Sequence, residues 1–582
     1  MVTAPAMPTV ARVSPDVTGL DKEFDYVVPA GLDVAVGTKV RVPLHGRRVG
    51  GWVVALDPPD AVAGERLREL VAVTSLGPAP ELVDLARWAA ERWAATRLRP
   101  FLVAASPPTR VTALPPTLRT GRVPAPVHED AAALLAAGGG MLRLPPSADV
   151  GPVLLAAAAR GPVLVVVPAV ERARLEAARL RRAGLSVAVV PGDWALAAGG
   201  VDVVIGARAA AWAPCPDVAA IVVVDEHDEA LQEERSPTWH ARDVAAERAR
   251  RAGVPLLLVS PCPSVCGLHV VGDRLRRPAI DDERAGWPLV EVVDRSRDEP
   301  WKTSLVTSAL ITHLRDHART VVCVHNTPGR ARILACRSCR TLARCAVCEA
   351  AVALTDDETL SCRRCGAGRP VVCLHCGAGA FANLRPGVTR LREELEAAAG
   401  RPVLAVTGPD PAPPRPAGVY VGTEAVLHRV PRADVVAFLD LDAELLAPRY
   451  RAAEQAMALL VRGARLVGPR TAGGRLLVQT FLPHHEVVRA ALLADPGRLV
   501  APERERRRAL GLPPYAALAA ISGSGSEEVA AALRHVAGVQ VGGGQGSYTV
   551  RAADWLTLGR AIRAVPRPRG SRLRVEVDPP RR

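Results

Sequence analysis

Short apolar, β-branched runs separated by turn residues dominate the first hundred positions. The runs are FDYVVP (24–29), TKVRVPL (38–44) and VGGWVVAL (49–56). Runs of this length, bounded by Gly, Pro and basic residues, are typical of strands. A helical spacing of Leu and Trp follows over 81–95. The pattern predicts a β-rich N-terminal domain over 1–105 and a Pro-rich linker over 106–139.

From residue 140 onward, apolar runs alternate with Ala-, Arg- and Glu-rich helical segments. The runs are 163–168, 201–206, 220–225, 255–260, 320–326, 402–406, 418–422, 434–442 and 475–480. This alternation predicts parallel sheets covered by helices on both faces. We expect two α/β lobes, 140–290 and 291–480, with a cysteine-rich insert at 336–376 in the second. A small α+β domain is predicted over 481–582.

The charge and the N-terminus narrow the class of protein. A net charge of +14 and a pI near 9.7 favour a polyanionic partner, nucleic acid before an anionic membrane. A general arginine bias would explain the same numbers. The N-terminus lacks the pattern of a signal peptide, and the most apolar stretch, 151–170, is interrupted by Arg160, Gly161 and Pro168. We therefore expect no membrane association and a reducing cytoplasm, where clustered cysteines are metal ligands more often than disulfides.

Eight of the twelve cysteines form four C-x-x-C pairs within forty-odd residues. The pairs are Cys336/Cys339, Cys345/Cys348, Cys362/Cys365 and Cys373/Cys376. Two such pairs supply the four thiolates of one tetrahedral zinc site, so four pairs predict two zinc ions in closed, structural sites. Nested and interleaved combinations of the pairs both fit the loop lengths. A redox role for one pair is the competing interpretation. The close succession of four C-x-x-C pairs argues against it.

The stretch VVVDEHDEAL (222–231) has the form of a buried strand that ends in acids, as at the magnesium-binding edge of an ATP-driven motor. Such a box works together with a Gly-rich loop whose Lys reaches the phosphates. The chain has three lysines, Lys22, Lys39 and Lys302, and none lies in that motif. Where the loop should lie, the sequence reads LRLPPSADVGP (142–152), in which two prolines remove backbone N–H donors. We therefore predict that ATP is not bound.

Together these features resemble one family, the primosomal protein N′ (PriA) replication-restart helicases, over nearly the whole chain. The segments that carry the resemblance are FDYVVP, TKVRVPLHGRR, VDVVIGARAA, VVVDEHD, SPCPS, the cysteine ladder, VYVGTEA, RALGLPPY and RVEVDPP. The resemblance implies an N-terminal domain that captures the 3′ end of a DNA strand, two helicase lobes, a two-zinc insert and a small C-terminal domain.

The resemblance also implies how the cysteines combine, because the family joins them in the nested way. The expected ligands are Cys336, Cys339, Cys373 and Cys376 for the first zinc ion, and Cys345, Cys348, Cys362 and Cys365 for the second.

For DNA contact, the resemblance places Asp25 and Tyr26 in the pocket for a 3′-terminal nucleotide. Asp25 would accept a hydrogen bond from the terminal 3′-OH; a turn aspartate that caps its own backbone is the alternative. Arg47 and Arg48 follow a predicted hairpin turn and would neutralise phosphates, unless they form a solvated basic turn.

The departures from the family concern its motor. The Pro-containing segment replaces the phosphate loop, and Leu466 and Pro469 stand where the family has two arginines that reach the γ-phosphate. The chain is similar to the divergent form of the family in high-GC bacteria. We interpret Asp225 and Glu226 as a degenerate Walker B box and assign no catalytic residue.

The leading hypothesis is a replication-restart (primosome) protein that binds branched or forked DNA, without helicase activity of its own. It would act with primosome and replication proteins, and with single-stranded DNA-binding protein, in the nucleoid. Two enzymatic alternatives are an active ATP-dependent 3′–5′ helicase with an unrecognised nucleotide site and a nuclease. The nuclease would hold metals with Asp225, Asp228 and the second-lobe acids Asp440, Asp442 and Glu444. A purely structural zinc protein, without preference among DNA forms, is the third alternative.

Overall fold

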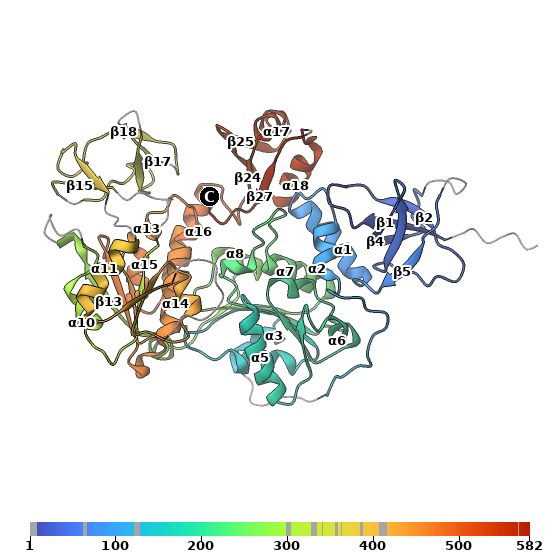
Figure 1. The fold of residues 1–582 in the computed structure, drawn as a ribbon, viewed down its shortest axis with the longest axis horizontal. Helices are drawn as coiled ribbons and strands as arrows, with labels where there is room; N and C mark the ends of the chain where they lie inside the picture. Colours follow the sequence, from blue (N-terminus) through green and yellow to red (C-terminus); the bar gives the residue numbers. More distant parts are fainter. Residues whose placement is uncertain are drawn as a thin grey trace, which may run out of the picture.

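A computed structural model describes most of the chain. The described residues are 9–61, 67–121, 128–297, 304–326, 334–339, 341–355, 359–362, 364–383, 388–406, 416–568 and 570–581. Lys302 and residues 122–127 of the predicted linker lie outside the described residues. The N-terminal sheet lies at one end of the molecule, and the two lobes lie side by side with the insert and the C-terminal sheet above them (Figure 1).

The N-terminal domain is a five-stranded antiparallel sheet in the order β2-β1-β4-β3-β5, followed by two helices. The elements are β1 (Val10–Pro15), β2 (Phe24–Val27), β3 (Lys39–Leu44), β4 (Arg47–Leu56), β5 (Ala72–Ser75), α1 (Pro80–Arg92) and α2 (Arg99–Ala105). Val40 and Val42 alternate with the exposed Arg41, so one face of β3 forms the core. His45 and Gly46 join β3 to β4 with φ values of 48° and 76°, the left-handed pair that a two-residue hairpin turn requires.

The first lobe is a seven-stranded parallel sheet in the order β12-β6-β11-β10-β7-β9-β8. Its strands are β6 (Gly139–Arg143), β7 (Val163–Val166), β8 (Val187–Val190), β9 (Val203–Gly206), β10 (Ala220–Val224), β11 (Leu256–Ser260) and β12 (Leu275–Arg276). Its helices are α3 (Glu129–Ala136), α4 (Gly151–Ala158), α5 (Val170–Arg182), α6 (Trp194–Gly199), α7 (Ala241–Ala252), α8 (Val265–Val270) and α9 (Ile280–Ala285). Along β10, Ile221 and Val223 face one hydrophobic cluster while Val222 and Val224 face another, because successive side chains of a strand point to opposite faces.

The second lobe is a six-stranded parallel sheet in the order β13-β23-β22-β14-β21-β20. Its strands are β13 (Leu289–Asp294), β14 (Val321–Val324), β20 (Val403–Val406), β21 (Val419–Gly422), β22 (Val435–Phe438) and β23 (Arg475–Thr480). Its helices are α10 (Ser308–Leu314), α11 (Val388–Ala399), α12 (Val426–Arg429), α13 (Asp442–Leu445), α14 (Ala452–Val467) and α15 (Glu486–Leu492). Gly463 lets α14 lie close to the sheet, since an added Cβ would be 2.9 Å from Leu476 and 3.0 Å from Phe438.

The insert and the C-terminal domain are small sheets. The strands of the insert are β15 (Leu334–Cys336), β16 (Val352–Leu354), β17 (Thr359–Cys362), β18 (Gly368–Pro370) and β19 (Phe381–Asn383). After α16 (Val500–Ala509), the C-terminal elements are β24 (Ala517–Ser522), α17 (Ser526–Leu533), β25 (Val539–Gly544), β26 (Ser547–Ala552), α18 (Trp555–Ala564) and β27 (Arg574–Val577). This architecture confirms the predicted fold class, and the domain boundaries stay predictions.

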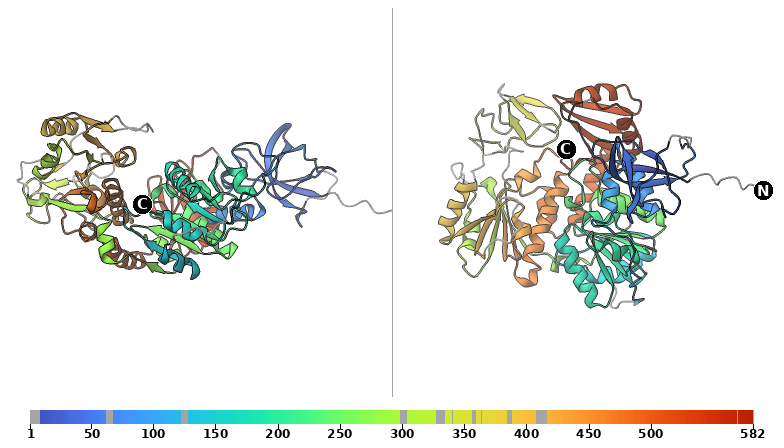
Figure 2. Two further views of the ribbon diagram at one scale, coloured as in Figure 1. Left: turned by 90° about the horizontal axis from the view of Figure 1, so that it is seen from below. Right: turned by 45° about the vertical axis from the view of Figure 1, so that its right-hand side comes forward.

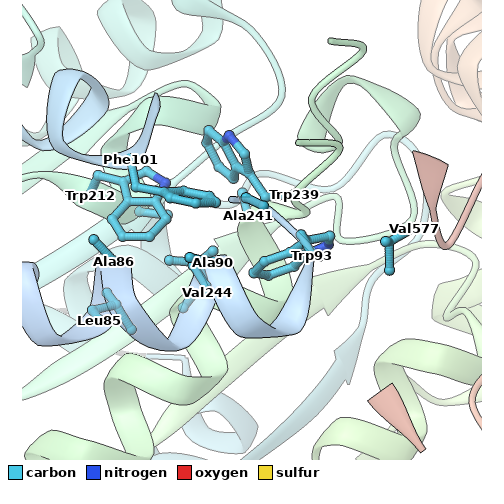
Figure 3. Close-up of a cluster of buried hydrophobic side chains, with 14 of the residues drawn as sticks. Leu85, Ala86, Ala90, Trp93, Phe101, Trp212, Trp239, Ala241, Val244 and Val577 are labelled. Carbon is cyan, nitrogen blue, oxygen red and sulfur yellow. The ribbon is translucent and has the colours of Figure 1, made fainter. Parts of the chain in front are cut away.

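One core joins the N-terminal helices, the first lobe and the C-terminal sheet. Figure 3 shows Trp93, which directly follows α1, Trp239 and Val244 of the first lobe, and Val577 of β27 in the same cluster. Helix α18 crosses α1 closely, because a Cβ on Gly559 would lie 1.9 Å from the carbonyl oxygen of Glu91. The N-terminal sheet is therefore attached to the lobes through a packed interface.

The end of the chain lies where the second lobe meets the rest of the molecule (Figures 1 and 2). Gln455 Nε2 of α14 donates to the carbonyl oxygen of Pro580 (2.8 Å), and Arg581 pairs with Glu229 of the first lobe (3.1 Å). The C-terminal segment thus contacts both lobes. Among the described residues, none of the helices is long and apolar enough to cross a membrane.

Candidate functional site

The N-terminal sheet carries a pocket of about 600 Å³ at the end of the β1–β2 pair. It is lined by Arg12, Glu23, Phe24, Asp25, Tyr26, Pro43, Leu44, His45, Asp60, Leu67 and Arg68. Two of the predicted DNA-binding residues, Asp25 and Tyr26, are brought together here. Arg47 and Arg48 are exposed at the start of β4, beside the pocket residue His45 rather than among its lining.

Asp25 is held by an arginine that the sequence reasoning missed. Arg12 and Asp25 are directly opposite each other in the β1–β2 ladder. Arg12 Nε donates to one carboxylate oxygen of Asp25 (2.8 Å) and Nη2 donates to the other (3.1 Å). The Asp25 side chain is 5% exposed, so this ion pair fixes the carboxylate at the pocket wall.

The opposite edge of Arg12 is also occupied. Its Nη1 donates to both carboxylate oxygens of Asp60, at 2.9 and 3.1 Å, and the Asp60 side chain is 73% exposed. The hydrogen bond to Asp25 raises the pKa of Arg12, burial opposes this, and Asp60 adds to the rise. Arg12 is therefore a permanent cation between two acids.

Tyr26 lines the pocket and also links two strands of the sheet. Its ring is 4% exposed, and its hydroxyl donates to the carbonyl oxygen of Pro43 (3.2 Å). Burial raises the pKa of Tyr26, so the hydroxyl keeps its proton. The contact ties β2 to β3 and shapes the pocket floor.

The eight paired cysteines form two groups in the nested arrangement. Cys336, Cys339, Cys373 and Cys376 lie together, and so do Cys345, Cys348, Cys362 and Cys365, with the sulfur atoms of each group within 4.8 Å of one another.

The spacing of the sulfur atoms fits a metal site. The Sγ···Sγ distances between partnered cysteines are 3.5 and 3.6 Å in the first group and 3.4 and 3.5 Å in the second. A tetrahedral zinc site with Zn–S bonds of about 2.3 Å places its sulfurs roughly 3.8 Å apart, whereas a disulfide needs about 2.05 Å. Backbone N–H groups of Val347 and Arg364 donate to Cys345 and Cys362 Sγ (3.4 Å each), and such bonds stabilise thiolates. The residues fit two zinc ions.

The acidic box at the end of β10 faces arginines of the second lobe. Arg465 of α14 donates from Nη1 and Nη2 to the two carboxylate oxygens of Asp225, at 2.8 Å each. One turn earlier on the same helix, Arg462 pairs with Asp228 (2.9 Å). By the resemblance, Leu466 and Pro469 stand at the positions of the family's two arginines. The neighbouring Arg465 and Arg462 reach the acids instead.

Arg465 also contacts the segment that replaces a phosphate loop. Its Nε donates to the carbonyl oxygen of Pro146 (3.1 Å). The guanidinium group therefore lies between that segment and Asp225. In a working motor, the loop and the acid hold the phosphates and the magnesium ion from these two sides.

The electrostatics of this contact favour a fixed ion pair. Burial alone would raise the pKa of Asp225, but Arg465 outweighs it and lowers that pKa to about 2. The backbone φ of Asp225 is 53°, an unusual value for a residue other than Gly.

Glu226, the second residue of the box, is enclosed in the first lobe. Its side chain is 0% exposed and accepts hydrogen bonds from Ser264 N (2.7 Å), Ser264 Oγ (2.9 Å) and Arg242 Nη1 (3.3 Å). Gly267 leaves room for it, because a Cβ there would lie 2.4 Å from a Glu226 oxygen. Glu226 thus anchors the start of α8 and lies away from solvent.

Two of the second-lobe acids considered for a nuclease, Asp442 and Glu444, have partners within their own lobe. Asp442 accepts from Thr480 Oγ1 (2.6 Å) and Phe481 N (2.9 Å), and Glu444 pairs with Arg449 (2.6 Å). Within the described part of the chain, the two cysteine groups are the sets of three or more His, Cys, Asp or Glu whose ligand atoms lie together. A two-metal reaction needs several convergent carboxylates, so this geometry gives the nuclease hypothesis no support.

A family model of known proteins matches the N-terminal domain. Residues 12–105 match the family model of the PriA 3′ DNA-binding domain (3′BD). This range contains Arg12, Asp25 and Asp60.

Similarity to curated proteins extends over most of the chain. The chain is 30% identical over 571 residues to the probable replication restart protein PriA of Mycobacterium bovis. The alignment covers 87% of this chain and 85% of that protein. It is 27% identical over 345 residues to the replication restart protein PriA of Thermotoga maritima, with 56% and 46% covered. Among solved structures, the Escherichia coli DEAH/RHA helicase HrpB matches with a TM-score of 0.32 and 14% identity, over 63% of this chain and 43% of that chain.

Proposed function

Because this chain belongs to the PriA replication restart family, we propose that it binds stalled or branched DNA forks at a free 3′ end and helps to reload the replication machinery. We further propose that it does so without working as a helicase. The lobes then serve as a scaffold that positions the end-binding pocket, the insert and the C-terminal sheet.

The pocket of the N-terminal sheet supports the DNA-binding part of the proposal. Asp25 lies at its wall and is held as a carboxylate by Arg12. A carboxylate accepts a hydrogen bond from a terminal 3′-OH, a group that an unbroken strand does not have. Arg47 and Arg48 are exposed beside the pocket, where cations neutralise phosphates in any DNA form. We thus assign recognition of the free 3′ end to Asp25, and general affinity for DNA phosphates to Arg47 and Arg48.

The position of Arg465 carries the non-helicase part of the proposal. Its guanidinium bridges Pro146 and Asp225, the two sides between which a motor holds magnesium and phosphates. A cation supplied by the second lobe in this place competes with Mg²⁺ for Asp225. Glu226 is fully buried, and its carboxylate is bound by Ser264 and Arg242. Because Arg465 occupies the place of the magnesium ion beside Asp225, we propose that ATP is not turned over.

Zinc belongs to the proposal as a structural group. Each of the two nested cysteine groups would hold one ion, which would fix the chain of the insert and supply no reaction chemistry. The insert is joined to the second lobe by the Ala351 N–H, which donates to the carbonyl oxygen of Leu446 (3.0 Å). We propose that this zinc-stabilised insert recruits primosome and replication proteins and single-stranded DNA-binding protein at forks in the nucleoid.

Binding to matched forks tests the proposed function. One fork carries a free leading-strand 3′-OH, and its partner carries the same strand blocked at the 3′ position. Asp25→Ala should lower the preference for the free end by roughly ten- to a hundredfold, because a hydrogen bond to a charged acceptor contributes about 1.5–3 kcal/mol. The double variant Arg47→Ala with Arg48→Ala is the control, and it should weaken both forks alike and flatten the salt dependence.

Two outcomes of this experiment would count against the proposal. If Asp25→Ala weakens both forks equally, or neither, Asp25 does not read the 3′ end. If the unmodified chain binds all DNA forms alike, the molecule is a structural zinc protein with a general affinity for DNA.

A further inference from the structure

Arg12 has two hydrogen-bonding edges, and the structure uses them differently. The Nε/Nη2 edge binds the buried Asp25, while Nη1, on the other side, binds the exposed Asp60. An arginine can hold a carboxylate on one edge and a phosphate on another, since its five N–H groups form a rigid fork. The two partners of Arg12 also differ sharply in how firmly they are held.

Asp25 is fixed and Asp60 is not. Asp25 lies within β2, opposite Arg12 in the ladder, with 5% of its side chain exposed. Asp60 lies on a turn in which Ala61 N donates to the carbonyl oxygen of Pro58 (3.0 Å), and 73% of its side chain is exposed. Ion pairs with one partner this exposed contribute little stability and exchange readily with other ions.

The acids of the pocket differ in whether they can make way for a phosphate. The lining includes three carboxylates, Glu23, Asp25 and Asp60, against two guanidinium groups, Arg12 and Arg68. Glu23 lies near Arg87 (3.4 Å) and Asp25 is locked. A phosphate that approaches Nη1 of Arg12 therefore meets the Asp60 carboxylate in its place, and the exposed Asp60 is the acid that can leave.

We propose that Asp60 is a displaceable stand-in for DNA phosphate. On binding, the phosphodiester beside the 3′-terminal nucleotide replaces Asp60 on Arg12, while Asp25 stays on the other edge and accepts the 3′-OH. This inference rests on the proposed function of Asp25 and adds Arg12 as the residue that joins phosphate binding to end recognition. Only a terminal nucleotide presents a phosphate on one side and a free 3′-hydroxyl on the other. The Arg12 guanidinium would therefore fix the distance between the bound phosphate and the carboxylate that accepts the 3′-OH.

Asp60→Asn tests this inference, because the substitution removes the competing charge from an exposed side chain. Affinity for a fork with a free 3′-OH should rise roughly two- to fivefold, the range set by an exposed ion pair. The gain should vanish when the last linkage of that strand is a neutral methylphosphonate, since no charged phosphate then reaches Arg12. Asp33→Asn, which removes an equal charge from an exposed position outside the pocket lining, should leave the affinity unchanged within error.

Arg12→Lys provides the second arm of the experiment. Lysine keeps the charge but lacks two opposed edges, so the end preference and the effect of Asp60→Asn should both be lost. The Tm of this variant should stay near that of the parent chain, and Asp60→Asn gives an answer even if Arg12→Lys does not fold.

The outcomes separate this inference from the function on which it rests. If Asp25→Ala abolishes the end preference but Asp60→Asn leaves affinity unchanged or lowers it, the displacement model is wrong and end recognition stands. An Asp60→Asn gain of equal size on the methylphosphonate fork also overturns the model. If Asp25→Ala has no effect on end preference, the proposed function itself fails.

Discussion

Replacing Arg465 perturbs the contact that distinguishes this molecule from a motor. Arg465→Gln removes the two hydrogen bonds to Asp225 and the bond to the carbonyl oxygen of Pro146. Asp225 then remains buried at the end of β10 without its cation. We expect the two lobes to separate more easily, because this side chain links them directly.

The pKa of Asp225 gives the size of the effect. It falls from 3.8 to about 2 in the folded chain, and a tenfold change in proton affinity corresponds to about 1.4 kcal/mol. The lowered pKa of Asp225 then stabilises the folded chain by roughly 2 kcal/mol at neutral pH, a contribution present above pH 4 and lost as the pH falls through 2. Because Arg465 is 38% exposed, solvent screening reduces this value, and we expect a coupling energy of about 1–2 kcal/mol.

A double-mutant cycle measures that coupling. Arg465→Gln, Asp225→Asn and the double variant are compared by urea unfolding, using the first transition of this multidomain chain. Hydrogen exchange of residues 144–150 locates the change. Arg250→Ala is a matched control, because Arg250 pairs with Glu247 within α7 and is 71% exposed; its effect should stay within about 0.5 kcal/mol.

Two results would refute this reasoning. A coupling energy below about 0.5 kcal/mol would show that the ion pair does not hold the lobes. Faster exchange throughout the first lobe, rather than at residues 144–150, would show that Arg465 stabilises that lobe in general.

Two further predictions concern the second lobe. Metal analysis of the purified chain should give two zinc ions, and Cys348→Ser should leave one and expose the insert to proteolysis without changing the lobes; one ion or none in the parent chain would contradict this. Burial, with the neighbouring Asp440, raises the pKa of Asp442 to about 7, so the folded chain binds a proton more tightly than the unfolded chain between about pH 4 and 7. Stability should fall as the pH rises through that window, and Asp442→Asn should reduce the fall by at least about 1 kcal/mol in urea unfolding at pH 5 and pH 7.5; an unchanged slope would show that Asp442 does not titrate there.

Patterns of local sequence were sufficient for the architecture and for the cysteine pairs. Alternating β-branched runs and helical segments predicted both parallel sheets, because strands and helices of α/β lobes carry different periodicities. The spacing of the C-x-x-C pairs predicted two four-cysteine zinc sites, but not which pairs combine in each site. Cys345 and Cys348 lie in one group with Cys362 and Cys365, rather than with Cys373 and Cys376. The pairing of β16 with β17 brings these cysteines together.

The contacts that define the sites depend on register and on distance between elements. Arg12 faces Asp25 because β1 and β2 pair in that register, and a shift of one residue would point the side chain to the other sheet face. Arg465 reaches Asp225, 240 positions away, because Gly463 sets the depth of α14. Arg465 lies one position before the motif position that Leu466 occupies and still contacts Asp225, a contact that motif positions alone do not predict.

Fork-stimulated ATP hydrolysis tests the central claim most directly. The purified full chain is incubated with Mg²⁺, ATP and a fork that carries a free 3′-OH, and its turnover is compared with that of Asp225→Asn. We expect tight fork binding together with hydrolysis at the level of the protein-free background, identical for both chains. Hydrolysis that the fork stimulates and that Asp225→Asn abolishes would contradict the account, since it would show that the cleft bridged by Arg465 is a working motor.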